Sequence, residues 1–261
     1  MTGRTDDLTE TQRGEVLWLT FNRPAARNAL TFAMYERLAE ICATLPTDGS
    51  VKSMVIAGAG GKAFAAGTDM TQFRAFQSEQ DALDYERQID AVLEAVERCP
   101  VPTIAAIHGA CTGGGASIAA ACDIRIASAR LKFGFPIART LGNCLAAGNL
   151  ARLSELMGAG RVREVIFTAR LVEAEEALNI GLVSEVLDDE PSLTRRAEEL
   201  AQQVSIMAPL TLRATKEALR RNRAAVQVDD ADLILSCYMS DDFKTGMEAF
   251  LSKSKPAWSG K

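Results

Sequence analysis

The 261-residue sequence contains a single histidine, His108, and no cysteine pair in a C-x-x-C spacing. Structural zinc sites need closely spaced cysteine and histidine ligands, and a Ser-His-Asp triad needs a histidine as its base. These absences argue against structural zinc, a histidine-based metal site and triad catalysis. The six cysteines are scattered, mostly in apolar surroundings where a thiol behaves as a small buried hydrophobe.

The sequence also lacks long apolar runs and an excess of positive charge. No run approaches the roughly 18 apolar residues of a membrane span. The opening MTGRTDDLTETQRGE has neither the apolar core of a signal peptide nor a transit-peptide pattern. The net charge of −5 disfavours nucleic-acid binding, because neutralising phosphates requires clustered basic residues. We expect a cytoplasmic protein with neither a membrane nor a nucleic acid as its partner.

Nucleotide-binding fingerprints are missing too. The segment G-A-G-G-K at residues 58–62 looks like a phosphate-binding loop, but that motif requires glycine where Ile56 stands and serine or threonine where Ala63 stands. Neither glycine cluster in the chain fits G-x-G-x-x-G. The sequence therefore argues against a nucleotide hydrolase and against a dinucleotide-dependent dehydrogenase.

The pattern that is present alternates strands with helices. Thr31 and Ser78 are placed to cap helices, and a third helix of small residues is expected at 116–122. Strands are expected at Val16–Phe21, Val51–Ala57, Thr103–Ile107, Asp123–Ala127, Leu131–Phe135 and Leu182–Leu187. Strands that are apolar on both faces indicate an α/β fold with a largely parallel sheet.

The last sixty or so residues contain helical patterns and no strand pattern. We therefore divide the chain into a core at residues 1–200 and a helical C-terminal segment at residues 201–261. Apolar residues in this segment exceed what a small appendage buries by itself, which favours self-association.

Two glycine-containing segments follow expected strands: A-F-A-A-G-T-D-M at residues 63–70 and H-G-A-C-T-G-G-G at residues 108–115. Small residues at the transition from strand to helix let a ligand approach the backbone and leave N–H groups free. Two such N–H groups directed at one point would form an oxyanion hole. Each segment alone is better explained by a tight turn, and only their occurrence together in one parallel-sheet domain favours a binding site.

Together these segments, preceded by N-R-P-A-A-R-N-A-L, resemble the crotonase family, also called the enoyl-CoA hydratase/isomerase family. Further matches follow in order: A-C-D-I-R-I-A-S, E-A-L-N-I-G-L-V-S-E-V, A-P-L-T-L-R-A-T-K-E-A-L and G-M-E-A-F-L-S-K-S-K-P-A-W. The resemblance covers almost the whole chain and implies a spiral of ββα units with a helical C-terminal segment that builds trimers, often paired into hexamers. It also implies acyl-CoA substrates, as in fatty acid metabolism, with coenzyme A entering as part of the substrate and no separate cofactor.

Carried onto this sequence, the resemblance places the oxyanion hole at the backbone N–H groups of Thr68 and Gly114. An enolate at the thioester oxygen is shared by hydration, isomerisation, decarboxylation and dehalogenation, and donors aimed at that charge stabilise the transition state. Candidate contacts to coenzyme A are Arg23, Arg27, Ala66, Asp69 and Lys253, with Lys255 an alternative to Lys253. The basic residues among them are otherwise solvated surface charges, and Asp69 is expected to fix the backbone of its loop.

The sequence departs from the family at the catalytic positions. Hydratases of this family use two glutamates to hold and activate water, and those positions here are Ser117 and Ile137. A serine hydroxyl titrates far from neutrality and isoleucine carries no proton to transfer, so the usual two-carboxylate mechanism cannot operate.

Several residues are candidates to replace the missing glutamates. Ser117 and Asn143 can hydrogen-bond water or substrate, and Arg139 can bind an anion or a carboxylate on the acyl chain. Cys144 is a candidate nucleophile without a nearby histidine to activate it, and His108 is better explained as a core histidine.

Three hypotheses remain open. The first is a lyase or isomerase of the enoyl-CoA hydratase type with altered acid and base residues. The second is a catalytically silent acyl-CoA-binding protein. The third is an enzyme that uses the same oxyanion hole for isomerisation, decarboxylation or thioester hydrolysis.

Overall fold

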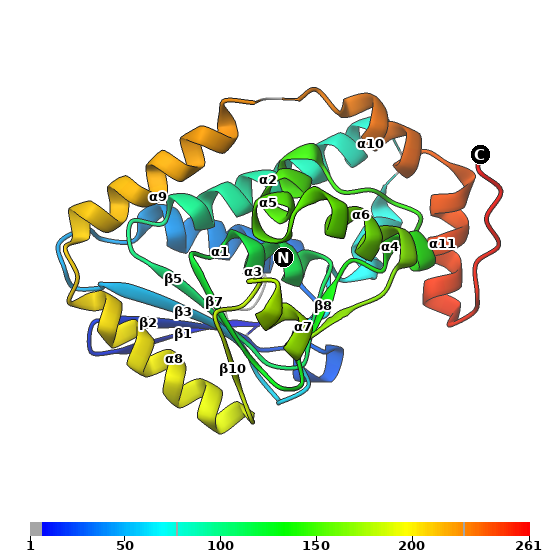
Figure 1. Ribbon diagram of the computed structural model, residues 1–261. Coiled ribbons are helices and arrows are strands. Elements are labelled where there is room, and N and C mark those ends of the chain that lie inside the picture. Colours follow the sequence, from blue (N-terminus) through cyan, green and yellow to red (C-terminus); the bar gives the residue numbers. More distant parts are fainter. Residues whose placement is uncertain (1–6, 77, 227) are drawn as a thin grey trace.

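The protein is described here by a computed structural model that covers residues 7–76, 78–226 and 228–261. Two sheets lie at its centre, with helices on both sides of the larger one (Figure 1). The first six residues of the polar stretch at the N-terminus lie outside the described residues.

The larger sheet has six strands in the order β1-β2-β3-β5-β7-β10. β1 pairs antiparallel with β2, and the remaining pairs are parallel. The strands are β1 (Leu8–Arg13), β2 (Val16–Phe21), β3 (Ser53–Gly58), β5 (Thr103–Ile107), β7 (Ile124–Ser128) and β10 (Glu185–Leu187). A largely parallel sheet confirms the expected α/β class.

The smaller sheet has four strands in the order β4-β6-β8-β9. These strands are β4 (Ala63–Ala65), β6 (Ala110–Thr112), β8 (Lys132–Gly134) and β9 (Val172–Glu173). In the pairs β3-β4, β5-β6 and β7-β8, the first strand joins the large sheet and the second joins the small one, and a helix follows each pair. This repeat is the spiral of ββα units that the sequence resemblance implies.

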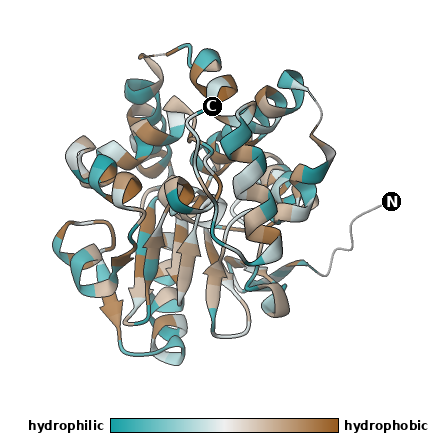
Figure 2. Cartoon of the chain, turned by 90° about the vertical axis from the view of Figure 1, so that its right-hand side faces the viewer, coloured by the Kyte–Doolittle hydropathy of each residue, from teal (hydrophilic) through white to brown (hydrophobic). Residues whose placement is uncertain are grey.

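Alternation along the strands separates two cores. In β2, Leu17 and Leu19 face the main core, whereas Val16 and Trp18 face a second core that includes α8 (Glu190–Ser205). Helices that contribute to the main core include α1 (Phe32–Thr44), α2 (Glu79–Arg98) and α3 (Gly114–Ala121). In Figure 2 the strands are mostly brown and many helices change from brown to teal across their width, as expected for a sheet buried between amphipathic helices.

The capping residues predicted from sequence are confirmed. The Thr31 side chain accepts a hydrogen bond from the N–H of Met34, and Ser78 forms a reciprocal capping box with Asp81. The further helical elements are η1 (Pro24–Ala26), η2 (Met70–Ala75), α4 (Ile137–Thr140), α5 (Ala147–Met157), α6 (Ala159–Thr168), α7 (Ala174–Asn179), α9 (Pro209–Ala224), α10 (Ala231–Tyr238) and α11 (Asp241–Ser252).

The strand at residues 8–13 of the polar N-terminal stretch was not among those expected from the sequence. These residues form β1, an edge strand whose outer positions are exposed. The polar sequence suits an edge, because only one side of the strand pairs with the sheet. β4, β6 and β9 were also not expected, since two or three residues are too few for a periodic pattern.

The expected boundary at residue 201 falls inside α8, and α8 packs on the large sheet. From residue 209 onward the described residues form helices and no strand. α10 and α11 fold back over α2 and α4. None of the described helices is both long and apolar enough to span a bilayer.

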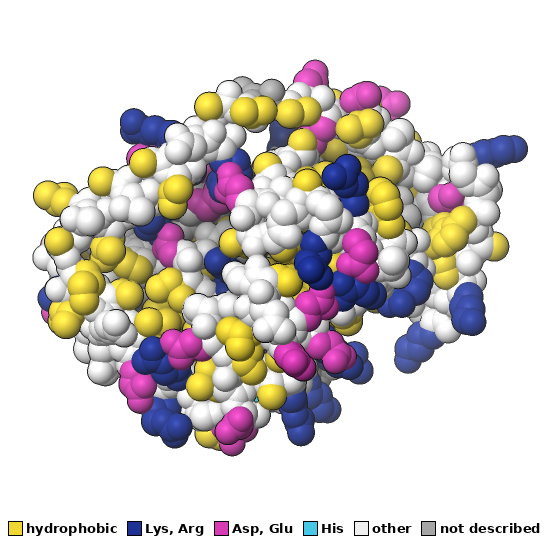
Figure 3. Space-filling model, viewed as in Figure 1, with side chains coloured by type: hydrophobic (Ala, Val, Ile, Leu, Met, Phe, Trp, Pro, Cys, Tyr) yellow, Lys and Arg dark blue, Asp and Glu magenta, His cyan; other side chains and the backbone are white. Residues whose placement is uncertain are grey.

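α9 differs from the other long helices because it buries none of its residues. It is attached through charged side chains: Arg223 pairs with Glu97, Arg220 with Glu94 and Lys216 with Asp123. Leu210 and Leu219 are 75% and 63% exposed. Figure 3 shows hydrophobic side chains over α9 and a hollow beside it.

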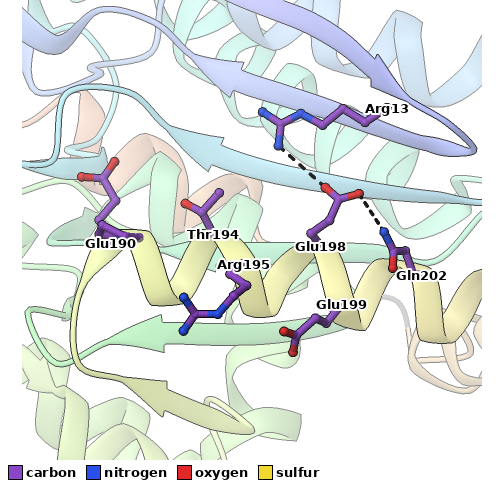
Figure 4. A pocket seen from close by; sticks show the side chains of 8 residues that line it. Arg13, Glu190, Thr194, Arg195, Glu198, Glu199 and Gln202 are labelled. Carbon is purple, nitrogen blue, oxygen red and sulfur yellow. Dashed lines mark hydrogen bonds and ion pairs between the residues drawn. The ribbon is translucent and has the colours of Figure 1, made fainter.

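The two tryptophans lie in different surroundings. Trp18 is 4% exposed, and its Nε1 donates to Glu198 at 2.8 Å while the Arg13 guanidinium lies over its ring. Trp258, near the C-terminus, is 42% exposed and lies beside Gly142. Arg13 and Glu198 also border a shallow surface depression along α8 with Glu190, Thr194, Arg195, Glu199 and Gln202 (Figure 4).

Candidate active site

The two glycine segments singled out in the sequence meet in the smaller sheet. β4 and β6 are adjacent parallel strands, with Ala65 opposite Cys111, so their carboxyl ends lie at the same edge. Gly67 and Thr68 follow β4, and Gly113 follows β6 as the N-cap residue of α3, which starts at Gly114. The topology therefore brings Thr68 and Gly114 together, as the sequence resemblance implies.

The backbone at both positions has N–H groups without an internal acceptor. Thr68 forms a parallel bridge with Leu30, in which Leu30 N–H donates to Gly67 and Asp69 N–H donates to Leu30. The Thr68 N–H consequently points away from Leu30, and Gly114 is the first residue of α3, where no preceding turn supplies an acceptor. Within the described part of the chain, neither N–H donates a hydrogen bond.

Glycine is needed where the two segments touch. Gly113 has φ of 52°, and a Cβ on it would lie 3.4 Å from the Cα of Gly67. A Cβ on Gly114 would lie 1.8 Å from the Tyr35 hydroxyl oxygen and 3.3 Å from Oγ1 of Thr68. The Gly114 backbone and the Thr68 side chain are therefore neighbours.

Three side-chain hydroxyl groups, those of Tyr35, Thr68 and Tyr85, lie next to one another beside Gly114. Oγ1 of Thr68 lies 2.9 Å from the Tyr35 hydroxyl oxygen and 2.9 Å from that of Tyr85. Burial raises the pKa of both tyrosines above the usual value, so both hydroxyls stay protonated at neutral pH. These hydroxyls were not predicted from the sequence; the signal was a tyrosine among the apolar residues of the first helix, beside Met34 and Leu38.

Ser117 and Ile137 are both buried. Ser117 is 2% exposed; its hydroxyl donates to the Gly113 carbonyl at 3.3 Å and accepts from Nδ2 of Asn149 at 2.7 Å. Ile137, at the start of α4, is packed in the main core. Ser117 thus bonds its own helix and α5, and Ile137 presents an apolar surface.

The other replacement candidates lie in and after α4. The Arg139 side chain is exposed, whereas Nδ2 of Asn143 donates to the hydroxyl of Tyr238 at 3.2 Å. A hydrogen bond with Cys237, together with burial, raises the pKa of Cys144, which keeps its thiol protonated and disfavours the nucleophile hypothesis.

The Tyr238 hydroxyl donates in turn to Glu86 of α2 at 2.5 Å. Glu86 is 7% exposed and was not among the site residues predicted from the sequence. The signal was its spacing: Glu86 precedes Ile89 by three residues and Leu93 by seven, which places a carboxyl on the apolar face of a helix.

Of the candidates for coenzyme A, Arg23 and Asp69 bind each other. Nη2 of Arg23 lies 3.0 Å from Oδ2 of Asp69, whose Oδ1 accepts from the N–H and hydroxyl of Thr71. Burial acts to raise the pKa of Asp69, but the hydrogen bonds from Thr71 and the Arg23 charge outweigh it and lower the pKa. Asp69 therefore caps η2 and fixes its loop.

The remaining candidates for coenzyme A are accessible. Arg27 and Lys253 are exposed, as is Lys255. The Ala66 N–H donates to the carbonyl of Arg27 at 3.1 Å, so these two residues lie side by side next to Gly67.

His108 is 8% exposed, and its Nε2 lies 3.0 Å from the Gly61 carbonyl oxygen. Its Nδ1 has no partner among the described residues. One ring nitrogen is thus used to hold a loop, in line with a core histidine.

The ββα spiral, the two strand ends meeting at Thr68 and Gly114, and the helical C-terminal segment define a protein of the crotonase fold. The family model "Enoyl-CoA hydratase/isomerase" matches residues 11–261, and the chain belongs to that family.

Known relatives support this assignment. The short-chain-enoyl-CoA hydratase of Clostridium acetobutylicum is 34% identical over 250 residues, covering 94% of each chain. A crystal structure of an enoyl-CoA hydratase/carnithine racemase from Magnetospirillum magneticum superposes with a TM-score of 0.78 at 32% identity, covering 98% of this chain and 96% of that one. Methylmalonyl-CoA decarboxylase in complex with 2-nitronate-propionyl-CoA superposes with a TM-score of 0.88 at 25% identity, covering 97% and 98%. The family thus includes hydratases and decarboxylases.

Proposed function

We propose that the protein is an enzyme that binds acyl-CoA thioesters and stabilises an enolate at the thioester oxygen between the N–H groups of Thr68 and Gly114. The observation that carries this proposal is the pair of backbone N–H groups, just beyond the adjacent strands β4 and β6, that donate no hydrogen bond within the described residues. Preorganised backbone donors contribute most where negative charge develops, and one such donor typically changes a rate by about 10²–10³-fold.

Coenzyme A would lie against the exposed basic residues. Arg27 adjoins Ala66 and therefore the oxyanion segment, and Lys253 ends α11. Either charge would attract the CoA phosphates, whereas Arg23 is committed to Asp69 and acts on the loop.

Hydration is expected to be a weak activity of this enzyme. Ser117 already bonds Gly113 and Asn149, and Ile137 is apolar, so neither residue supplies a carboxylate to hold and activate water. A surviving reaction has to form or use the enolate with other groups.

Decarboxylation is the second candidate, favoured by the close superposition on methylmalonyl-CoA decarboxylase. Loss of CO₂ from the α-carbon leaves the electron pair of the broken C–C bond in the enolate, so no base is needed for that step. A proton donor must then quench the enolate. Arg139, exposed on α4, and Asn143 are candidate contacts for the departing carboxylate.

Exchange at the α-carbon tests the proposal. Acetyl-, butyryl- and octanoyl-CoA would be incubated with the protein in deuterated water, and deuterium uptake read by mass spectrometry. Exchange shows enolate formation, and its loss in Gly114→Pro ties it to the proposed donor. Calorimetric binding of these thioesters without exchange would instead identify a silent acyl-CoA-binding protein, and the absence of both would remove the proposal.

A further inference from the structure

Glu86 is a carboxyl group buried without a cation. Burying an ionised carboxylate is costly unless an opposite charge compensates. Glu97, on the same helix, has such partners in Arg152 and Arg223. Glu86 has no ion pair with any residue that the structure describes, and its hydrogen bonds come from the Tyr238 hydroxyl and the backbone at Ala146.

The charges that face Glu86 are negative. Burial, followed by the repulsion of Asp90, raises the pKa of Glu86 to about 7, although the Tyr238 hydrogen bond acts to lower it. Asp90 itself is paired with Arg152. The other titratable groups that interact with Glu86 are Asp230 before α10, Tyr238 on α10, Tyr85 on α2, Tyr35 on α1 and Cys144 after α4.

Glu86 is flanked by the elements that build the candidate site. The preceding residue, Tyr85, carries the hydroxyl that bonds Oγ1 of Thr68. The other neighbour, Ala146, is the N-cap residue of α5, whose Asn149 holds Ser117 one turn into the helix that starts at Gly114. α2 also packs directly on α3. The carboxyl is therefore on a helix that contacts the loop of Thr68 and the helix of Gly114, and its charge acts on the buried Tyr35 hydroxyl that bonds Thr68.

We propose that Glu86 is the catalytic acid/base that exchanges a proton with the α-carbon of the acyl group, in place of the glutamates missing at Ser117 and Ile137. This inference rests on the proposed enolate chemistry. As a base, the carboxylate takes the α-proton. The C–H electron pair becomes the π bond between Cα and the carbonyl carbon, and the carbonyl π pair moves to the oxygen held by Thr68 and Gly114. In reverse, protonated Glu86 delivers a proton to an enolate, including one left by decarboxylation.

Tyr238 is a positioning residue in this arrangement. Its hydroxyl donates to Glu86 and accepts from Asn143, so it holds the carboxyl on one side of α2. Oδ1 of Asn143 is buried and has no partner among the described residues, which leaves an acceptor free at the same place. Because Tyr238 belongs to α10, the C-terminal segment helps to complete the site.

The test is deuterium exchange into butyryl-CoA by full-length wild type, Glu86→Gln, Glu86→Asp and the matched control Glu94→Gln, which changes a half-exposed carboxyl two turns along the same helix. A positioned acid or base contributes about 10²–10⁴ in rate, so Glu86→Gln should lose about 100-fold or more with unchanged CoA affinity. Glu86→Asp should retain part of the exchange, and Glu94→Gln all of it. Wild-type exchange should rise with pH around 7, and Tyr238→Phe should shift that midpoint upward because a donor to the carboxylate is removed.

The outcomes separate this inference from the proposed function. Exchange by wild type that persists in folded Glu86→Gln, or a pH profile that Tyr238→Phe leaves unmoved, overturns the role of Glu86 and leaves the enolate chemistry standing. No exchange by wild type with any of the three thioesters overturns both. If Glu86→Gln does not fold, Glu86→Asp and the pH profile decide.

Discussion

The Tyr35 hydroxyl occupies the place beside Gly114 where a side chain would begin, 1.8 Å from the position of a Cβ. Tyr35 is 1% exposed and its hydroxyl bonds Thr68, so it has little freedom to move aside. The tyrosine and the glycine are therefore matched in shape.

Gly114→Ala should force this contact apart. Overpacking of a filled site costs about 1–3 kcal/mol of unfolding free energy, and the displaced turn should also lower α-proton exchange. Combining it with Tyr35→Phe removes the clashing oxygen and should recover part of both losses, as denaturant unfolding and mass spectrometry will show. Equal losses with and without Tyr35→Phe would mean that the two residues are not coupled.

Restoring both family glutamates should raise hydration. We expect wild type to hydrate crotonyl-CoA with a turnover number far below the value typical of enzymes, which is about 10 s⁻¹. Ser117→Glu with Ile137→Glu should increase the rate at least about tenfold, since each positioned carboxyl is worth about 10²–10⁴ when well placed. The hydration rate is measured as the decrease in ultraviolet absorbance when the conjugated thioester is consumed.

The control for that experiment is Ser117→Gln with Ile137→Gln, which has the same shape without acid or base. Each single glutamate should do far less than the pair, because the two groups act on one water. A wild-type rate already near the enzymatic norm would contradict our account of the missing carboxylates, and Arg139, Asn143 and Ser117 would be the first residues to substitute.

Stability should depend on pH through Glu86. Its pKa is raised from 4.5 to about 7 in the folded protein, so the folded state binds more protons than the unfolded state between these values. The contribution therefore favours folding at low pH and is lost as pH rises toward 7. Relative to Glu86→Gln, wild type should lose up to about 3 kcal/mol between pH 4.5 and 8, at 1.36 kcal/mol per pKa unit. Denaturant unfolding of the two proteins across this range measures the difference; parallel curves would contradict the burial of this carboxyl.

Coenzyme A binding should distinguish the two arginines near residue 25. Arg27→Ala removes an exposed charge and should weaken CoA binding about tenfold, equivalent to 1.4 kcal/mol, with stability unchanged. Arg23→Ala should instead lower stability, because Asp69 loses its partner. Calorimetry and thermal unfolding of both variants give the comparison, and Lys253→Ala should resemble Arg27→Ala if its charge also meets a phosphate.

The exposed leucines of α9 should mediate self-association into a trimer or a pair of trimers. Leu219→Glu combined with Leu210→Glu should yield monomers by light scattering at micromolar concentration, because charge would enter an apolar contact. Arg221→Gln changes a side chain that is 73% exposed on the same helix and should leave the mass unchanged. A monomeric wild type would contradict this prediction.

The large sheet was predictable because its strands carry a local signal. Val16–Phe21 and Thr103–Ile107 are uninterrupted, mostly apolar runs, and the structure has strands with those bounds. β4 and β6 gave no such signal, since a run of only three residues becomes a strand only through the neighbour it pairs with. The positions of Thr68 and Gly114 followed from the family resemblance, which supplies tertiary information that periodicity lacks.

The side-chain network around the site was not predictable in the same way. Tyr35, Tyr85 and Tyr238 come from three helices, and only the packing of α1, α2 and α10 brings their hydroxyls near Thr68 and Glu86. Glu86 was within reach of sequence reasoning, as a charged residue on an apolar helix face, and Tyr35 lies among the apolar residues of the first expected helix.

The contrasting surroundings of Trp18 and Trp258 give the molecule two optical reporters. The wavelength and intensity of indole fluorescence change when the ring becomes exposed to water. Trp18 would therefore report the separation of α8 from the sheet. Trp258 would report the release of the C-terminal residues from Gly142. A small soluble quencher would reach the half-exposed Trp258 first. In Trp258→Phe the remaining tryptophan is the buried Trp18, which reports the separation of α8 from the sheet. Comparing this variant with wild type then separates the opening of the two ends of the fold.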